Sequence, residues 1–191
     1  MNAPFSPPLK PQKVKLRVED FALLVEAGSF ADYAKSELVE GEVFVVNAQF
    51  RPHGFAKQQL YLSLNEALKQ SDSGLTAVIE FSVAIPPNDM PEPDIALTSE
   101  PIGLGAVPVE TVALIVEVSD STLQIDLGRK AVLYASAGVA EYWVADLEGR
   151  RIHQMWSPRE NGYLERRIVS FGDIVTSETV AGVMVYAVGL I

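Results

Sequence analysis

One acidic residue lies inside an apolar run near the middle of the chain, in the stretch ALIVEV (residues 113–118). Side chains alternate along a strand, so Glu117 would share a face with Ile115 and Ser119, and its two valine neighbours would point into a core. A carboxylate that is removed from water costs several kcal/mol unless a cation or hydrogen-bond donors meet it. The position of Glu117 therefore raises the question of which group meets it.

The helical pattern that follows this strand offers a candidate partner. Asp126, Lys130 and Tyr134 recur at a spacing of four residues and would lie along one stripe of a helix. If this helix packs back on the sheet, Lys130 can reach Glu117. By itself, the Asp126 and Lys130 pair could equally be a surface salt bridge, worth about a few tenths of a kcal/mol.

A second acidic residue, Asp94, follows Pro93 and opens a predicted short strand, 94–98. Acids at the start of one strand and at the end of a neighbouring antiparallel strand, with a lysine nearby, suit a hard divalent cation such as Mg²⁺ or Mn²⁺. Aspartate is also a favoured turn residue, so Asp94 could serve only to cap a turn.

The composition limits the classes of function. The chain has 191 residues, of which 48% are hydrophobic, and this favours a single domain (16–191) preceded by a flexible, proline-rich arm (1–15). Lys and Arg number 15 against 25 Asp and Glu, so the net charge of −10 should repel nucleic acid and anionic membranes. A polyanionic partner would then need a metal ion or a local basic patch.

The chain contains no cysteine, which excludes disulfides and cysteine-based zinc sites. Its first residues carry proline where a signal peptide would have an apolar core, and no apolar run approaches the ~18 residues of a membrane span. We expect a soluble, cytoplasmic protein with no membrane partner.

Helical and strand patterns alternate along the chain and predict an α/β (α+β) protein with a central mixed sheet flanked by helices. Apolar stripes are expected on the first helix at Phe21, Leu24 and Val25, and on the second at Phe55, Leu60, Leu64, Ala67 and Leu68. The predicted helices are 17–28, 52–70 and 123–137, the last closed by Gly138. The predicted strands are 36–48 with a turn at Glu40 and Gly41, 75–85, 94–98, 111–118, a hairpin over 140–157 that turns at Glu148 and Gly149, 162–170 and 180–191.

Two apolar regions admit two interpretations. The C-terminal segment VAGVMVYAVGLI (180–191) and the aromatic hairpin with Tyr142, Trp143 and Trp156 could bury a dimer interface or complete the core. We expect a homodimer, with core completion as the alternative.

The order of Asp94 on a short strand, Glu117 on the next strand and a lysine nearby resembles the active site of the PD-(D/E)XK nuclease superfamily. More narrowly, the pieces FALLVEAGSF, SELVEGEV, PHGFA, PEPDIAL and VEVSDSTLQIDLGRKAVLYASAGVAEYWVAD resemble a bacterial family of restriction endonuclease-like proteins of unknown biological role. The resemblance runs from about Leu16 almost to the C-terminus, and its most specific part is the last piece. It implies a restriction endonuclease-like fold and a metal-dependent endonuclease that hydrolyses phosphodiester bonds of DNA.

The chain departs from the superfamily pattern at one position. Two residues after the glutamate, where the signature carries lysine, this chain has Ser119. The resemblance implies that the lysine has moved to the following helix, where Lys130 is the matching residue. A long, flexible ammonium group can reach the same point from a helix as from a strand.

The resemblance also assigns roles. Asp94 and Glu117 would bind Mg²⁺ or Mn²⁺, Lys130 would orient the attacking water or stabilise the developing negative charge, and an early acid, matched by Glu37, would hold a metal-bound water or a second ion. Glu40 and Glu42 are close enough in sequence to be confused with Glu37. His53 matches a family histidine, and we favour a position at the edge of the cleft over a ligand role. The accessory candidates are His53, Glu40, Ser119, Asp126 and Tyr134.

Two other functions stay open. The net charge of −10 and the lack of a recognisable DNA-reading motif suggest a catalytically weak or inactive relative that acts as a binding or assembly module. The same acids and lysine would also serve a hydrolase of smaller phosphate esters. Residues that could contact a nucleic-acid backbone elsewhere are Lys10, Lys13, Lys15, Arg17, Arg150, Arg151, Arg166 and Arg167, although each is more typical of a solvated surface charge.

Overall fold

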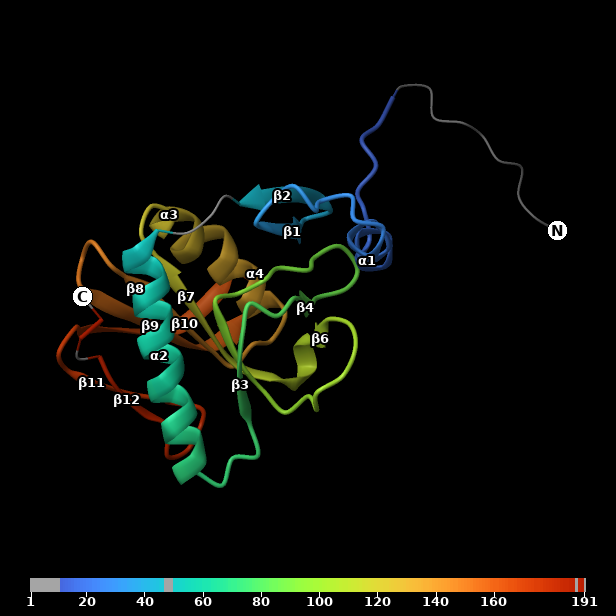
Figure 1. The fold of residues 1–191 in the computed structure, drawn as a ribbon. Coiled ribbons are helices and arrows are strands. Elements are labelled where there is room, and N and C mark those ends of the chain that lie inside the picture. Colours follow the sequence, from blue (N-terminus) through green and yellow to red (C-terminus); the bar gives the residue numbers. More distant parts are fainter. Residues whose placement is uncertain (1–10, 47–49, 188, 191) are drawn as a thin grey trace.

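The computed structural model describes residues 11–46, 50–187 and 189–190 and shows a mixed α+β fold around a six-stranded sheet (Figure 1). The strand order is β10-β9-β8-β7-β5-β3. These strands are β3 (Thr76–Ile79), β5 (Ile95–Thr98), β7 (Val112–Ser119), β8 (Glu141–Asp146), β9 (Arg151–Arg159) and β10 (Gly162–Ser170). Only the pair β7 and β8 is parallel within this sheet, because a helical segment joins the two strands and returns the chain to the starting edge. The predicted fold class is confirmed.

Helices cover both faces of the sheet (Figure 1). Helix α2 (Arg51–Gln70) packs on one face, and the segment formed by α3 (Leu123–Ile125), the π-turn η2 (Asp126–Lys130) and α4 (Ala131–Ser136) packs on the other. The remaining elements are α1 (Val18–Glu26), β1 (Lys35–Val39), β2 (Glu42–Val46), β4 (Val83–Ala84), β6 (Val107–Pro108), the 3-10 turn η1 (Val109–Thr111), β11 (Ile174–Thr176) and β12 (Met184–Tyr186).

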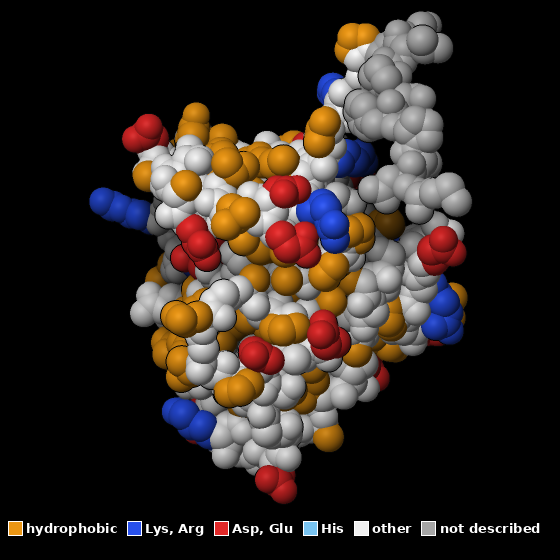
Figure 2. All heavy atoms as spheres, turned by 90° about the vertical axis from the view of Figure 1, so that its right-hand side faces the viewer, with side chains coloured by type: hydrophobic (Ala, Val, Ile, Leu, Met, Phe, Trp, Pro, Cys, Tyr) orange, Lys and Arg blue, Asp and Glu red, His pale blue; other side chains and the backbone are white. Residues whose placement is uncertain are grey.

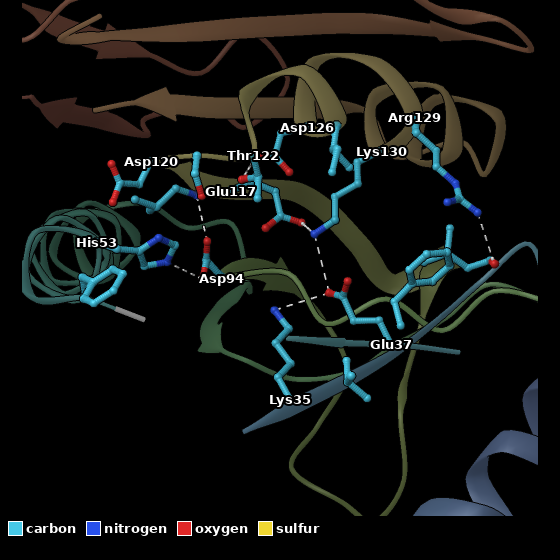
Figure 3. A pocket seen from close by; sticks show the side chains of 17 residues that line it. Lys35, Glu37, His53, Asp94, Glu117, Asp120, Thr122, Asp126, Arg129 and Lys130 are labelled. Atoms are coloured by element: carbon cyan, nitrogen blue, oxygen red, sulfur yellow. Dashed lines mark hydrogen bonds and ion pairs between the residues drawn. The ribbon is translucent and has the colours of Figure 1, made fainter. Parts of the chain in front are cut away.

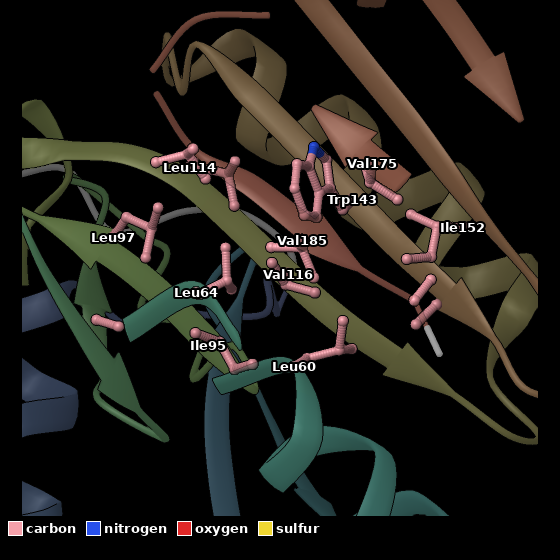
Figure 4. Packing of buried hydrophobic residues seen from close by; sticks show 14 of the residues in the cluster. Leu60, Leu64, Ile95, Leu97, Leu114, Val116, Trp143, Ile152, Val175 and Val185 are labelled. Atoms are coloured by element: carbon pink, nitrogen blue, oxygen red, sulfur yellow. The ribbon is translucent and has the colours of Figure 1, made fainter. Parts of the chain in front are cut away.

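The larger core lies between α2 and the sheet (Figure 4). Leu60 and Leu64 of α2 contact a layer that includes Val116 of β7 and Trp143 of β8, and all four side chains are fully buried. Ile115 belongs instead to the second core under α4. The alternation predicted for β7 is therefore present, and Glu117 faces the second layer.

Two predicted apolar stripes are partly wrong. Leu24 and Val25 are exposed, and Phe21 is the one buried residue of α1. This helix packs on the β1–β2 hairpin with Leu38 and not on the central sheet, so it has room for only one anchor. Phe55 of α2 is likewise half exposed, because it lies outside the line of residues that faces the sheet.

Two predicted strands are shorter than expected. The segment 75–85 breaks after β3, where Glu80 adopts a positive φ of 56°, and the chain leaves the central sheet to pair β4 with β6. In the segment 180–191, three residues form β12, which pairs with β11. Val188 and Ile191 of that segment lie outside the described residues.

One side of the segment before the C-terminus completes the core, and Met184 and Tyr186 on its other side are exposed. Val183, Val185 and Ala187 are fully buried in the layer that α2 covers. Tyr142 and Trp143 of the aromatic hairpin are also fully buried. Core completion accounts for the buried side chains of both regions, and the expected homodimer stays a prediction.

The predicted arm, residues 1–15, falls largely outside the described part of the chain, which begins at residue 11. From there to Arg17 the chain forms neither helix nor strand, and the backbone N–H of Leu16 donates to the carbonyl oxygen of Gly41. None of the described helices is long and apolar enough to cross a membrane.

Candidate active site

A cavity of about 510 Å³ opens where β5 and β7 meet at one end of the sheet (Figure 3). The β1–β2 hairpin forms one wall, the start of α2 a second, and the loop into α3 and η2 a third. Asp94, Glu117, Lys130 and Glu37 all line this cavity. The four residues that were predicted to form the site are thus brought to one place from four separate elements.

Glu117 is met by two donors. Its Oε1 atom lies 2.9 Å from the ammonium nitrogen of Lys130 and accepts a hydrogen bond from the hydroxyl of Tyr134, also at 2.9 Å. The side chain is 97% buried. Burial raises the pKa of Glu117 to about 7 against the lowering effect of Lys130, and the negative charge of Asp94 adds to the rise. The carboxyl group is therefore poised between its neutral and charged forms near neutral pH.

Lys130 is the last residue of the π-turn η2. Its wider turn breaks the regular spacing between Asp126 and Lys130. The ammonium of Lys130 forms its ion pairs with Glu117 and with Glu37, the latter at 3.5 Å. Asp126 is buried and accepts a hydrogen bond from the hydroxyl of Thr122 at 2.6 Å. The interpretation of Asp126 and Lys130 as a surface salt bridge is therefore wrong.

Asp94 lies beside Glu117 across the sheet, since the neighbouring residues Ile95 and Val116 are register partners. Its Oδ2 atom accepts the backbone N–H of Val118 at 2.8 Å, and its Oδ1 atom is 3.1 Å from Nε2 of His53. Burial opposes ionisation of Asp94, but the hydrogen bond and charge of His53 outweigh it and hold the pKa well below the usual range. The side chain of Asp94 therefore binds across to β7 and α2.

The structure distinguishes the three early acids. Glu37 is buried, and its Oε1 atom contacts Lys35 at 3.3 Å and Lys130 at 3.5 Å. Burial would raise the pKa of Glu37, but these two ammonium groups outweigh it and lower the pKa. Glu40 and Glu42 are exposed and pair with Arg129 and Lys13 respectively. Of the three, Glu37 is the residue that shares the cavity with Glu117.

The other accessory candidates lie at different places around these acids. His53 and Asp126 line the cavity. Tyr134 is fully buried behind Glu117. Ser119 is buried at the end of β7, where its hydroxyl lies 3.4 Å from that of Thr122.

Sequence reasoning missed three charged residues around the cavity. Lys35 pairs with Glu37 and donates to the carbonyl oxygen of Glu92. Lys57 lies 3.6 Å from Oδ1 of Asp94. Burial raises the pKa of the Glu92 carboxyl to about 7. The spacing held a signal for both lysines, because Lys35 is two residues before Glu37 on a strand and Lys57 is one helical turn after His53.

The carboxylates of the cavity suit a Mg²⁺ ion that keeps waters among its ligands better than an ion that is enclosed entirely by protein ligands. Within the described part of the chain, no three His, Asp or Glu side chains form a ready ligand cluster. Mg²⁺ is usually held by one or two carboxylates, with waters and substrate phosphates filling the other positions. Asp94 and Glu117, on adjacent strands at the edge of a cavity, supply this minimal set (Figure 3).

The mixed sheet places Asp94 at the start of one strand and Glu117 on the neighbouring strand, and Lys130 contacts Glu117. This arrangement defines a restriction endonuclease-like protein. The chain belongs to the Uma2 family, described as "Putative restriction endonuclease", whose model matches residues 18–188. The crystal structure of a putative nuclease belonging to DUF820 from Anabaena variabilis is similar in fold, with a TM-score of 0.64 and 13% identity over 84% of this chain and 88% of that chain. The comparison with curated proteins gave no match.

Proposed function

We propose that this protein is a metal-dependent endonuclease that hydrolyses phosphodiester bonds of DNA with Mg²⁺ or Mn²⁺. The observation that carries the proposal is the contact between Lys130 and Glu117 beside Asp94, within one cavity. Membership of the Uma2 family supports the same reaction class.

In this proposal Asp94 and Glu117 hold the cation. When bound, such an ion lowers the pKa of a water molecule and neutralises negative charge on the phosphate. The low pKa of Asp94 keeps that carboxylate charged, which suits a ligand. Tyr134 fixes one oxygen of Glu117 through its hydrogen bond and so orients the other.

Lys130 supplies a fixed positive charge at the same point. Burial opposes its protonation, but Glu117 and Glu37 outweigh burial and raise the pKa of Lys130, so the ammonium stays charged. It would orient the attacking water or stabilise the charge that develops on the phosphate. Glu37 is then a positioning residue, because it forms a second ion pair with Lys130.

Cleavage of supercoiled plasmid tests the proposal. Wild type, Glu117→Gln, Lys130→Met and the control Lys69→Met, which alters an exposed lysine of α2, are compared in Mn²⁺, Mg²⁺ and EDTA. We expect wild type and the control to nick plasmid only with metal, and the two site variants to lose roughly 100-fold or more of the rate. Equal cleavage by wild type and both site variants would reject these residues as the active site.

A second candidate function is a catalytically inactive binding or assembly module. The cavity favours it in one respect, because five acidic residues line it against three Lys or Arg. An absence of cleavage by wild type with both metals would support this alternative. Hydrolysis of a small phosphodiester but not of plasmid would instead indicate a smaller phosphate ester as substrate.

We also propose a homodimer, through the edge strand β10. This nine-residue strand ends the sheet and exposes Leu164 and Ile168. Antiparallel pairing of two copies centred on Arg166 would place Leu164 opposite Ile168 of the partner subunit and remove an open edge. Light scattering after size exclusion should give twice the chain mass for wild type and a monomer for Ile168→Lys. A monomeric wild type would overturn this proposal.

A further inference from the structure

We propose that the exposed apolar side chains of the cavity walls bind the base of an unstacked nucleotide, so the preferred substrate is single-stranded DNA or a duplex from which a nucleotide is extruded. The proposal deepens the proposed nuclease function and rests on it, since it names the substrate class of the same site.

Each of the three walls of the cavity carries exposed apolar side chains. Phe44 and Val45 come from β2, Phe50 precedes α2, and Ile125 ends α3, and all four line the cavity. Phe50 is 77% exposed and Ile125 53% exposed. Large apolar side chains that gather at the mouth of a charged cavity mark a binding surface more often than a defect of packing.

A planar cation and an aromatic ring contact each other at one side of the charged centre. His53, three residues after Phe50 in sequence, and Arg129 lie on opposite sides of the Glu117 and Lys130 pair (Figure 3). The guanidinium carbon of Arg129 is 4.8 Å from the centre of the Phe44 ring. The Arg129 Nε atom is buried and has no hydrogen-bond partner among the described residues. A ring and a planar cation together form the kind of platform on which a base stacks.

The charge of the cavity argues against capture of duplex backbone there. Lys35, Lys130 and Arg129 are the three Lys or Arg that line it, and each is paired with an acid. Binding to duplex phosphates needs several cations that can replace counterions. Stacking of a base on a ring does not depend on net charge. It can therefore contribute to the affinity for DNA even in a protein whose net charge of −10 repels the phosphates.

Four of the eight surface cations considered for backbone contacts form ion pairs with acids. Of the cations considered for backbone contacts, Arg151 pairs with Asp146 and Arg167 with Glu178. Lys10 lies outside the described residues. On the face shown in Figure 2, the Lys and Arg side chains are scattered among hydrophobic and acidic ones and form no continuous patch.

The size of the cavity is consistent with one nucleotide. Its volume of about 510 Å³ falls in the range of ligand pockets, roughly 300 to 1,000 Å³. A base inside a duplex has both faces stacked on its neighbours, so it must leave the stack before it can contact a ring in such a cavity. The acids beside the ring would then face the phosphate next to that base.

Binding and cleavage are measured with three labelled DNA substrates of one sequence: the single strand, its full duplex, and the duplex with a central unpaired bulge. Fluorescence anisotropy in Ca²⁺ reports binding, and cleavage is followed separately in Mn²⁺. We expect wild type to bind the single strand and the bulged duplex at least about 10-fold more tightly than the full duplex. Preference for the bulged duplex over the single strand would identify extrusion from a duplex as the source of the base, and the reverse would identify single strands.

The variants Phe44→Ala and Phe50→Ala should weaken binding of the single strand by about five- to 100-fold, the equivalent of ~1 to 3 kcal/mol per stacked base. Phe44→Leu keeps an apolar side chain without a ring and should show most of the loss, which separates stacking from a folding defect. Tyr186→Ala is the matched control, because Tyr186 is an exposed aromatic of β12, far from the β1–β2 hairpin (Figure 1).

The two proposals fail in different ways. If full duplex is bound and cut as well as single strand, and the phenylalanine variants match Tyr186→Ala, the base-binding proposal is overturned while the nuclease function stands. If no substrate is cut in Mn²⁺ but the phenylalanine variants weaken binding of single strands, the base site stands and the nuclease function is overturned.

Discussion

The ammonium nitrogen of Lys130 is 2.9 Å from Oε1 of Glu117, although thirteen residues separate the two in the chain. The contact forms because the segment after β7 folds back over the face of the sheet from which Glu117 projects. Glu37 approaches the same ammonium from another element, at 3.5 Å. Lys130 therefore keeps a partner when Glu117 is changed, which makes the consequences of such a change testable.

Glu117→Gln should leave the metal-free protein about as stable as wild type. The amide oxygen still accepts from Tyr134, Lys130 retains Glu37, and a carboxylate that is costly to ionise is removed. Thermal unfolding is measured in EDTA and in excess Mn²⁺, and we expect Mn²⁺ to raise the melting temperature of wild type only. A loss of ~3 to 5 kcal/mol in EDTA, with wild type indifferent to Mn²⁺, would make Glu117 a structural ion-pair partner.

The ionisation of Glu117 should contribute to the pH dependence of the unfolding free energy of the metal-free protein. Its pKa is about 7 in the folded protein against an ordinary 4.5, so the folded state holds the proton more tightly. The stability that this proton gives is fully present below about pH 4.5 and is lost as the pH rises through about 7.

The measurement is urea unfolding of wild type and Glu117→Gln in EDTA across this range. The stability of wild type relative to the variant should fall with rising pH, by at most a few kcal/mol, given ~1.4 kcal/mol per pKa unit. Glu92, whose pKa is also raised to about 7, is present in both proteins and cancels in the difference. A difference that does not change with pH would contradict the raised pKa of Glu117.

Glu37→Gln should reduce cleavage, because it removes a charge that holds Lys130 in place. We expect a loss of roughly 10- to 100-fold, in the range seen when a supporting partner of a site is lost. The control is Glu42→Gln in the same hairpin, since Glu42 is exposed and pairs with Lys13. Equal activity of both variants would exclude Glu37 as a positioning residue.

Glu141→Ala should destabilise the protein strongly without removing the response to Mn²⁺. The Glu141 carboxylate is fully buried and accepts from Trp143 and Gln154 at 2.6 Å, and from Ser177 and Thr179 in the segment before β12. Without it these buried donors lack their partner, at a cost of about 3 kcal/mol or more. Chemical unfolding with and without Mn²⁺ checks this, and an unfolding free energy close to that of wild type would disprove the structural role.

The sequence by itself determined the elements that hold the site. Alternation in the strand 111–118 identified the face of Glu117, and the helical spacing after it identified Lys130 as a residue within reach. Turn residues such as Gly41 and Gly138 marked where the hairpin and the helix end, and both have positive φ. These features depend on neighbours in the chain, so local patterns contain them.

Only the tertiary structure decided which acids share a cavity. Glu37, Glu40 and Glu42 are nearly equivalent in sequence, yet the packing of the β1–β2 hairpin against the loop at Glu92 buries one and exposes the others. The π-turn that ends at Lys130 leaves no local signature, because part of its support comes from another element: the hydroxyl of Tyr142 in β8 donates to the carbonyl oxygen of Asp126. The C-terminal segment is a core element only because α2 and the central sheet leave a place for it, which no local pattern records.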